Sequence, residues 1–291
     1  MILVNDHLKS TYGCKVYKLS LQAKVTCPVR DGKIDTRGCI FCSEGGSGDF
    51  AADRDKPIPE QIAEAKKRVS AKAGNDAKYI AYFQSFTNTY GPAEYLEGIF
   101  RQAMEPEDVV ILSVGTRPDS ISEEMYSVLE RLNKIKPVWV ELGLQTIHEK
   151  SAEYIRRGYT LDVYDECVKR LREIGITVIV HVILGLPGES KEDMQETVKY
   201  VCSSYVQGIK LQLLHVLKGT DLYEDYKAGK VPVMEMEEYM DLLRELIPLI
   251  PDEVIVHRLT GDGPKKLLAA PLWTADKKRV LNEIKKLLDA N

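Results

Sequence analysis

Residues 161–184 read LDVYDECVKRLREIGITVIVHVIL and hold the repeating unit of the fold. In residues 161–174, apolar side chains recur every three or four positions, which is typical of a helix with one buried face. Residues 177–184 are then almost continuously apolar, as expected for a parallel strand that is covered on both faces. A helix followed directly by a buried strand is half of a right-handed β–α–β unit.

The same alternation extends in both directions along the chain. Strands are expected at 16–22, 79–84, 109–113, 138–142, 177–184 and 209–215, with a weaker run at 254–258. Helices fit between them at 59–73, 92–104, 120–135, 161–174 and 191–202, and two more follow at 235–249 and about 275–288. This order predicts an α/β fold with one parallel sheet, either open or curled into a full or partial barrel. In a barrel, the chemistry lies at the carboxyl ends of the strands.

The composition excludes several classes of protein. The chain has 291 residues, of which 44% are hydrophobic and 29% charged, so it is neither disordered nor collagen-like. No apolar stretch approaches the roughly 18 residues that span a bilayer, and the N-terminus does not resemble a signal peptide. We therefore expect a cytoplasmic protein without membrane contact. Six cysteines are too few for a disulfide scaffold, so clustered cysteines indicate metal ligands or reactive thiols.

The charge is distributed unevenly. The net charge is −4, which argues against a globally basic nucleic-acid binder. Residues 257–291 nevertheless carry eight Lys or Arg against four Asp or Glu. This basic tail is either a site for an anionic partner or simply a solvated helix face. Its cations are Arg258, Lys265, Lys266, Lys277, Lys278, Arg279, Lys285 and Lys286.

Cys27, Cys39 and Cys42 give the strongest chemical signal. Eleven residues separate Cys27 from Cys39, and Cys39 and Cys42 form a C-x-x-C turn directly after the first expected strand. Cysteine thiolates hold iron–sulfur clusters, usually four at a time. Three ligands leave one iron open, and an open position is the mark of a catalytic metal site.

A structural zinc site with Cys14 as the fourth ligand is the alternative. Cys14 precedes the first expected strand and the other three follow it. The length of that strand, roughly 20 Å, would separate them, which weakens the zinc interpretation. Cys167 and Cys202 are expected to be small buried residues.

Five motifs, each at or after an expected strand end, carry a resemblance to the radical S-adenosylmethionine (SAM) superfamily. The resemblance covers residues 12–220. Its branch includes the catalytic subunit of Elongator and the oxygen-independent coproporphyrinogen oxidases, and the chain looks most like the YhcC/YtqA-like radical SAM proteins. The first cysteine gap is longer than the three residues common in the superfamily. The motifs are Cys27 with Cys39-Ile-Phe-Cys42, SVGTRPD at 113–119, ELGLQT at 141–146, RRGYT at 156–160 and HVILGLPGE at 181–189.

The resemblance implies a partial (β/α)6 TIM-type barrel. Residues 1–220 would form the radical SAM core with its N-terminal segment, and residues 221–291 a mainly helical C-terminal extension that contacts substrate or RNA. Cys27, Cys39 and Cys42 would bind a [4Fe–4S] cluster whose open iron holds SAM. One electron, from a reductase such as flavodoxin or ferredoxin, would cleave SAM to methionine and a 5′-deoxyadenosyl radical that removes hydrogen from the substrate.

The resemblance also implies nine residues around SAM, whereas residues that act on the substrate stay unassigned. Phe41 would pack on adenine, Arg117 would pair with the SAM carboxylate or a substrate anion, and Glu141 would bind ribose hydroxyls or the methionine ammonium. Core packing for Phe41, a surface salt bridge for Arg117 and a satisfied core position for His181 are the alternatives. The nine are Phe41, Gln84, Ser113, Arg117, Glu141, Gln145, Arg157, His181 and Leu184.

Near Gln84, relatives have a glycine-rich turn that contacts the SAM amino group. The chain has Ser85 and Thr87 there, without those glycines. His215 is a further possible pocket residue.

Relatives in this branch imply that the substrate is the wobble uridine of tRNA, with processing of an aminomethyl-type substituent at C5. The basic tail would bind phosphates, and Trp273 or Tyr205 could stack a base, although core packing suits both. Two alternatives remain: a radical SAM enzyme that acts on a small metabolite or a tetrapyrrole, and a non-catalytic zinc protein that binds RNA or another partner.

Overall fold

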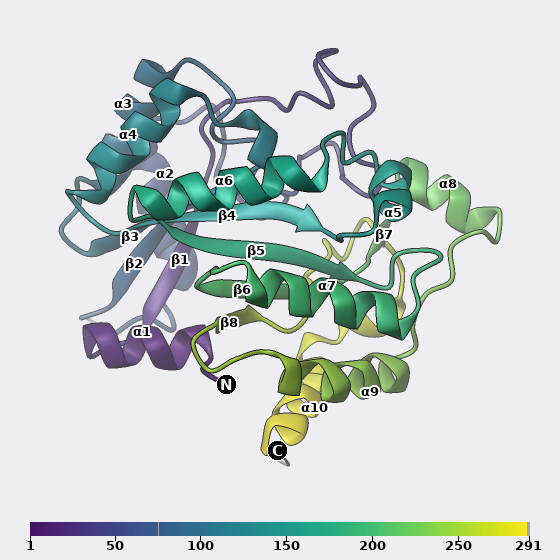
Figure 1. Ribbon diagram of the computed structural model, residues 1–291. Coiled ribbons are helices and arrows are strands. Elements are labelled where there is room, and N and C mark those ends of the chain that lie inside the picture. Colours follow the sequence, from purple (N-terminus) through teal and green to yellow (C-terminus); the bar gives the residue numbers. More distant parts are fainter. Residues whose placement is uncertain (75, 290–291) are drawn as a thin grey trace.

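A parallel sheet of seven strands curls into a half-barrel in the computed structural model, which describes residues 1–74 and 76–289 (Figure 1). The strands follow the order β1-β2-β3-β4-β5-β6-β8, and every neighbouring pair is parallel. This confirms the predicted partial barrel. The strands are β1 (Val16–Leu21), β2 (Lys78–Phe83), β3 (Val109–Thr116), β4 (Val138–Gln145), β5 (Thr177–Leu184), β6 (Gly208–Leu213) and β8 (Ile255–Arg258).

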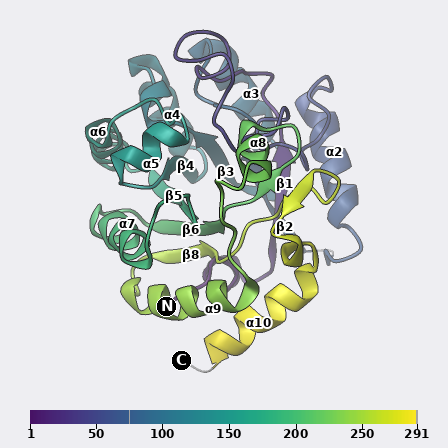
Figure 2. The ribbon, with the colours of Figure 1, turned by 90° about the vertical axis from the view of Figure 1, so that its right-hand side faces the viewer.

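Helices cover the outer face of the sheet, and Figure 2 looks onto the carboxyl ends of the strands that they surround. These helices are α2 (Ile58–Val69), α3 (Ala93–Met104), α4 (Glu123–Asn133), α6 (Leu161–Glu173) and α7 (Lys191–Ser203). The short α5 (Glu149–Tyr154) lies beyond the carboxyl end of β4 (Figure 1). The C-terminal part adds α8 (Asp221–Lys227), α9 (Met236–Leu246), α10 (Lys277–Asp289) and the short antiparallel pair β7 (Val216–Leu217) and β9 (Leu268–Ala270).

The inside and outside of the half-barrel follow from the two-residue period of each strand. In β5, Val178, Val180, Val182 and Leu184 join the large apolar core under the helices, whereas Ile179 and Ile183 belong to two smaller apolar clusters. His181 shares the parity of these two, so it points to the inside of the barrel. The inside therefore has an apolar layer at each end and a polar layer between them.

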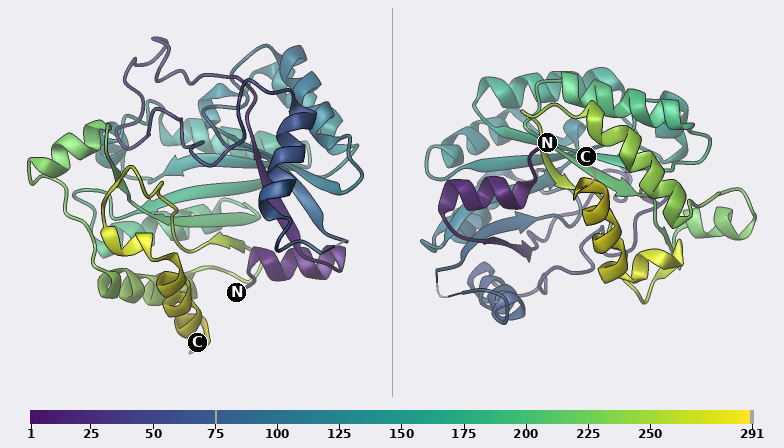
Figure 3. Two further views of the ribbon diagram at one scale, coloured as in Figure 1. Left: turned by 180° about the vertical axis from the view of Figure 1, so that it is seen from behind. Right: turned by 90° about the horizontal axis from the view of Figure 1, so that it is seen from below.

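Helix α1 (Val4–Tyr12) contacts both edge strands, β1 and β8 (Figure 3). Leu3 also forms an isolated parallel bridge with Val256 in β8. The N-terminal segment thus covers the open side of the half-barrel.

Two strands are longer than expected, and one lies in the expected extension. β3 and β4 run on to Thr116 and Gln145, past Gly115 and Gly143. A Cβ atom at Gly115 would lie 3.1 Å from the carbonyl oxygen of Phe83, so glycine lets the strands approach closely there. β8 lies within residues 221–291, so this segment contributes the seventh strand as well as helices.

Several short elements have no signal in the sequence. Helices α5 and α8 span one or two turns and β7 has two residues, which is too short for a periodic pattern. Within the described residues, no helix is long and apolar enough to cross a membrane.

Candidate active site

A cavity of about 1160 Å³ extends from the carboxyl ends of the strands into the barrel. Its lining includes the three cysteines of the loop that follows β1. Residues from the ends of β2, β3, β4 and β6 line it as well. Of the expected site residues, ten line this cavity: Cys27, Phe41, Cys39, Cys42, Gln84, Arg117, Glu141, Gln145, Arg157 and His181.

Two expected site residues do not line the cavity. Leu184 is fully buried in the core on the helix side of the sheet, because it has the opposite parity to His181. Ser113 is also fully buried, and its hydroxyl group donates to Glu141. Neither side chain is placed to contact a ligand in the cavity.

Arg30 holds the cysteine loop, which we define as residues 27–48. Its guanidinium donates to the carbonyl oxygens of Cys42, at 3.0 Å, and Ser43, at 2.6 Å. Gly38 has φ +80°, and a Cβ atom there would lie 2.9 Å from Arg30 Nε. The long gap between Cys27 and Cys39 therefore folds back tightly and presents all three thiols to one cavity.

Burial favours the protonated thiols of Cys39 and Cys42 in the protein alone. It raises the pKa of Cys39 to about 12, with a further contribution from the neighbouring Cys42, while Arg117 opposes the shift. Burial raises the pKa of Cys42 as well, against the nearby Arg30. A bound metal ion reverses this preference, because a coordinating thiol is deprotonated.

The spacing of the sulfurs is wider than a single zinc ion requires. Among the described residues, the only group of three or more potential ligand atoms that all lie within 4.8 Å of one another is His148, Asp193 and Glu196. Tetrahedral zinc, with Zn–S distances near 2.3 Å, would hold its sulfurs about 3.8 Å apart. Cys14 lies at the other end of β1 from Cys27. At least two of the three cysteine sulfurs lie more than 4.8 Å apart, which fits an iron–sulfur cluster with one open iron, in which each cysteine binds a different iron.

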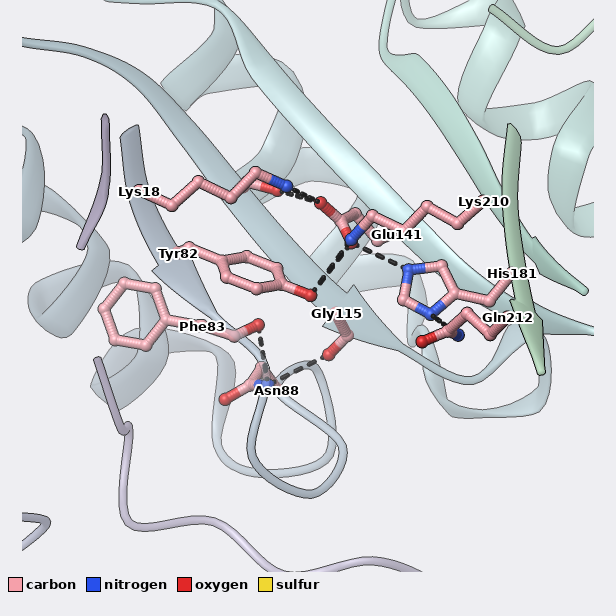
Figure 4. Close-up of polar contacts among 10 residues, drawn as sticks. Lys18, Tyr82, Phe83, Asn88, Gly115, Glu141, His181, Lys210 and Gln212 are labelled. Carbon is pink, nitrogen blue, oxygen red and sulfur yellow. Dashed lines mark hydrogen bonds and ion pairs between the residues drawn. The ribbon is translucent and has the colours of Figure 1, made fainter. Parts of the chain in front are cut away.

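The polar layer below the cysteines is built around Glu141 of β4 (Figure 4). Its Oε1 accepts from Lys18 Nζ at 3.2 Å and Ser113 Oγ at 2.9 Å. Its Oε2 accepts from Tyr82 OH at 3.0 Å, His181 Nε2 at 2.7 Å and Lys210 Nζ. The polar layer thus takes one or two side chains from each of six adjacent strands: Lys18, Tyr82, Ser113, Glu141, His181, Lys210 and Gln212.

The charges in this layer follow from burial and pairing. Burial would raise the pKa of Glu141, but Lys18, Lys210 and His181 outweigh burial and hold that pKa well below its usual value. Burial and the charge of Lys210 lower the pKa of His181 to about 4, although Glu141 opposes them. At neutral pH Glu141 is therefore ionised and His181 is neutral, with its Nε2–H donated to the carboxylate.

This arrangement bears on the role expected for Glu141. An ionised carboxylate offers about four lone-pair directions, and five donors already use them. The side chain is fully buried. Glu141 is therefore placed to fix its neighbours rather than to bind ribose or an ammonium group.

Two arginines brace the loop between β4 and α6. Arg157 donates to the carbonyl oxygens of Tyr159 and Thr146, at 2.9 and 2.7 Å, and to Glu149 at 3.1 Å. Arg117 pairs with Asp119 and donates to the carbonyl oxygen of Arg157 at 2.6 Å. Arg117 also lies near Cys39, whose pKa it lowers, so it is the arginine of this pair with influence on the cysteines.

Gln145 has a strained backbone and a side-chain oxygen without a hydrogen-bond partner. It has φ +73°, which is rare for a residue other than glycine, and its Oε1 is buried without a hydrogen-bond partner. It also lines the cavity. Strain and an unpaired acceptor at a cavity wall are typical of a ligand-binding position.

The motifs do not point to Lys18, Tyr82 or Lys210. A usable signal exists in the sequence, because a lysine interrupts each of two apolar strands, VYKLSL at 16–21 and GIKLQL at 208–213. A charged residue inside a strand that is covered on both faces needs a buried partner of opposite charge.

The two aromatic residues considered for base stacking lie elsewhere. Trp273 packs against Tyr239 with ring centroids 5.9 Å apart and donates Nε1–H to the carbonyl oxygen of Met234. Tyr205 is 85% exposed, so core packing is wrong for it. It precedes β6 and lies at the amino ends of the strands, away from the cavity.

Comparison with known proteins identifies the family. Residues 36–201 match the radical SAM superfamily, and residues 206–290 match the radical SAM C-terminal domain. The uncharacterized protein YtqA of Bacillus subtilis is 44% identical, over 98% of this chain and 88% of YtqA. The protein YhcC of Escherichia coli is 36% identical, over 97% of this chain and 90% of YhcC.

Two more distant matches are a sequence relative and a solved structure. The tRNA uridine(34) acetyltransferase of Methanocaldococcus jannaschii is 27% identical, over 55% of this chain and 29% of the acetyltransferase. The structure of Elp3 from Methanocaldococcus infernus superposes with a TM-score of 0.68 and 18% identity, over 91% of this chain and 63% of the Elp3 chain, which shows the shared fold. Enzymes of this superfamily use a [4Fe–4S] cluster and SAM. The chain belongs to the radical SAM superfamily and is a [4Fe–4S]-dependent enzyme.

Proposed function

We propose that this enzyme modifies the C5 substituent of the wobble uridine in tRNA. Its similarity to a tRNA uridine(34) acetyltransferase supports the choice of substrate. A cytoplasmic location would follow from that substrate. The electron would come from a small reductase such as flavodoxin or ferredoxin.

Cys27, Cys39 and Cys42 would hold the [4Fe–4S] cluster at one wall of the cavity. Together, the cluster and SAM supply the radical that removes a hydrogen atom from the substrate. Phe41, Gln84 and Gln145 line the adjoining wall, where SAM would lie. The polar layer also lines this cavity, and the volume that SAM leaves free would take a substrate base.

The observation that carries the proposal is a group of cations on the C-terminal side of the same cavity. Arg258, Lys265, Lys266 and Lys277 line it, and we call them the mouth cations. Lys265 and Lys266 are exposed, and Asp262 lies 2.9 Å from Lys277 and 3.6 Å from Arg258. Four cations on one side of the cavity, two of them paired with Asp262, would suit the phosphates on either side of a nucleotide whose base enters the cavity.

A second group of cations lies on α10. Lys278, Arg279, Lys285 and Lys286 line a separate depression there, together with Asp276, Glu283 and Asp289. This group would contact the RNA further from the target nucleotide. The proposed C-terminal extension, residues 221–291, would thus supply both RNA contacts.

The direct test is anaerobic incubation of the enzyme with reductant, SAM and bulk tRNA, followed by mass spectrometry of the nucleosides. We expect a mass change in a wobble uridine that carries a C5 substituent. If the enzyme cleaves SAM while every tRNA nucleoside stays unchanged, the substrate assignment fails.

A binding experiment tests the mouth cations. Changing Lys265, Lys266 and Lys277 to Glu should weaken tRNA binding by tenfold or more and reduce its salt dependence. The matched control reverses Lys134, Lys169 and Lys199, which are exposed at the end of α4, on α6 and on α7. Equal affinity of the two triple variants would contradict the proposed binding face.

A further inference from the structure

Two of the three cysteine sulfurs have a hydroxyl group beside them. Thr87 Oγ1 donates to Cys27 Sγ over 3.1 Å, and both residues are buried. Ser47 Oγ lies 3.6 Å from Cys42 Sγ in a more exposed position. We infer that Thr87 is a positioning residue for the [4Fe–4S] cluster. The O–H···S bond from Thr87 to Cys27 raises the reduction potential of the cluster. The inference rests on the proposed role of Cys27 as a cluster ligand.

The loop after β2 holds the Thr87 hydroxyl in place. The backbone N–H of Thr87 donates to the carbonyl oxygen of Thr26, at 3.2 Å, directly beside Cys27. The side chain of the next residue, Asn88, donates to the carbonyl oxygens of Phe83 and Gly115, at 3.1 and 2.9 Å (Figure 4). The loop is therefore tied to the ends of β2 and β3, and the hydroxyl group does not depend on a flexible segment.

The cysteine loop meets this loop from the other side. The N–H of Phe86 donates to the carbonyl oxygen of Gly46 at 2.9 Å, and Phe86 has φ +61°. A Cβ atom at Gly48 would lie 1.7 Å from Ser85 Oγ. Such close packing holds the cysteine loop against the loop that carries Thr87, so the hydroxyl group stays beside Cys27.

The expected effect on the potential follows from charge. Reduction adds an electron to the cluster and its thiolates, so a donor that points at a sulfur stabilises the reduced form more than the oxidised form. Removal of the donor must then lower the potential. Because the hydroxyl group has one proton, donation to Cys27 leaves it only an acceptor role toward any other group.

The test measures the midpoint potential of the anaerobically reconstituted cluster by a redox titration followed by electron paramagnetic resonance. Thr87→Val keeps the shape of the side chain and loses the donor, whereas Thr87→Ser keeps the donor. For Thr87→Val we expect the ratio of reduced to oxidised cluster at a fixed potential to fall about tenfold, a shift of about 59 mV for one electron. Thr87→Ser should stay close to the unaltered enzyme.

The matched control is Thr89→Val. The Thr89 hydroxyl is buried in the same loop, but its partners are oxygens, the carbonyl of Ser120 and the hydroxyl of Thr116, both at 2.6 Å. This variant loses a buried hydrogen bond of the same loop without touching a sulfur, so its midpoint potential should not move. An equal shift in both valine variants would overturn the inference, since loosening of the loop would then explain it.

The competing role for Thr87 is to bind the amino group of SAM. In that case Thr87→Val would weaken SAM binding and leave the potential unchanged, which would also overturn the inference. Cys27→Ala tests the assumption that Cys27 is a ligand of the cluster. Normal iron and sulfide in that variant would refute the ligand assignment, whereas an unchanged potential in Thr87→Val with normal iron refutes only the role of Thr87.

A measurement on the unaltered enzyme covers the case in which Thr87→Val fails to fold. The reduced cluster in D2O should show an exchangeable deuterium coupling from the hydroxyl group, which Thr89→Val keeps. Absence of that coupling in the unaltered enzyme would contradict the O–H···S bond.

Discussion

Glu141 organises the interior of the barrel as a single buried carboxylate with five donors. It neutralises Lys18 and Lys210 and fixes the tautomer of His181. The wall below the cysteines is rigid for this reason, since each member of the polar layer is held by another. Breaking such an ion group leaves charges buried without a partner, which is costly.

Glu141→Gln should lower the free energy of unfolding by about 3–5 kcal/mol, because two lysines lose their counter-charge in the barrel interior. Urea denaturation under anaerobic conditions measures the effect. Glu130→Gln, which breaks an exposed pair with Lys134 on α4, is the control and should cost about 1 kcal/mol or less. Equal losses in both variants would contradict the account of the polar layer.

The free energy of unfolding should decrease in acid, and His181 contributes to this decrease. Its pKa is about 4 in the folded protein, against about 6.5 unfolded, so the unfolded chain binds the proton first. This contribution is complete above about pH 6.5 and is lost as the pH falls toward 4. Glu141, whose pKa is held below its usual value, adds a loss only at lower pH.

His181→Gln should therefore flatten the fall in stability between pH 6.5 and 4, by about 3 kcal/mol at most. Urea midpoints measured across this range, for the variant and the unaltered protein, give the difference. A variant with the same slope would show that His181 is not held neutral.

The cysteines make a second prediction for single residues. Cys39→Ala should lose the iron–sulfur cluster and SAM cleavage, whereas Cys14→Ala should keep both, because Cys14 lies across β1 from the cavity. Iron and sulfide assays after anaerobic reconstitution measure the effect. Loss of the cluster in Cys14→Ala would instead support a site with four cysteine ligands.

At the scale of elements, the strand ends carry the site and their contacts depend on glycine. The cysteine loop reaches the loop after β2 because Gly46 lies against the ring of Phe86 and Gly48 against Ser85. Ser85 is buried and Phe86 is partly buried against the core, which limits how far either can move away.

Gly48→Ala should reduce cluster retention, because its Cβ atom would overlap the Ser85 hydroxyl and push the two loops apart. Gly98→Ala in α3 is the control: no atom lies within 4 Å of its Cβ position, and a helical alanine should add about 0.5–1 kcal/mol of stability. Iron content and thermal unfolding report both effects. A Gly48→Ala enzyme with full iron content would contradict the close packing.

The sequence predicts the elements well and the contacts poorly, for a physical reason. Periodic apolar side chains reveal where strands and helices lie, so β5 and α6 are found almost to the residue. The approach of Lys18 and Lys210 to Glu141 depends on the register of six strands, β1 to β6, which no local pattern contains. The same limit applies to Thr87 and Arg30, whose partners lie in other loops.

At the scale of the whole molecule, the C-terminal part completes the barrel. β8 pairs with β6, and its Val256 bridges to Leu3 near the N-terminus. The N-terminal amino group also pairs with Asp252. The N-terminal segment is thus joined to β8 and to the turn that precedes it.

We predict from these contacts that residues 1–220 alone do not fold stably. A chain cut after residue 220 exposes the β6 edge and the apolar surface that α9 covers on α7. Size-exclusion chromatography and circular dichroism should show aggregation or loss of structure in the fragment, in contrast to the full chain. A monomeric, cooperatively folded 1–220 fragment would contradict this prediction.

The central claim is that three thiols bind an iron–sulfur cluster with one iron left open to SAM. Its most direct test is the metal and sulfide content of anaerobically purified enzyme. The account predicts about four iron and four sulfide ions per chain, with a cluster signal that changes when SAM is added. One tightly held zinc ion without acid-labile sulfide would contradict it.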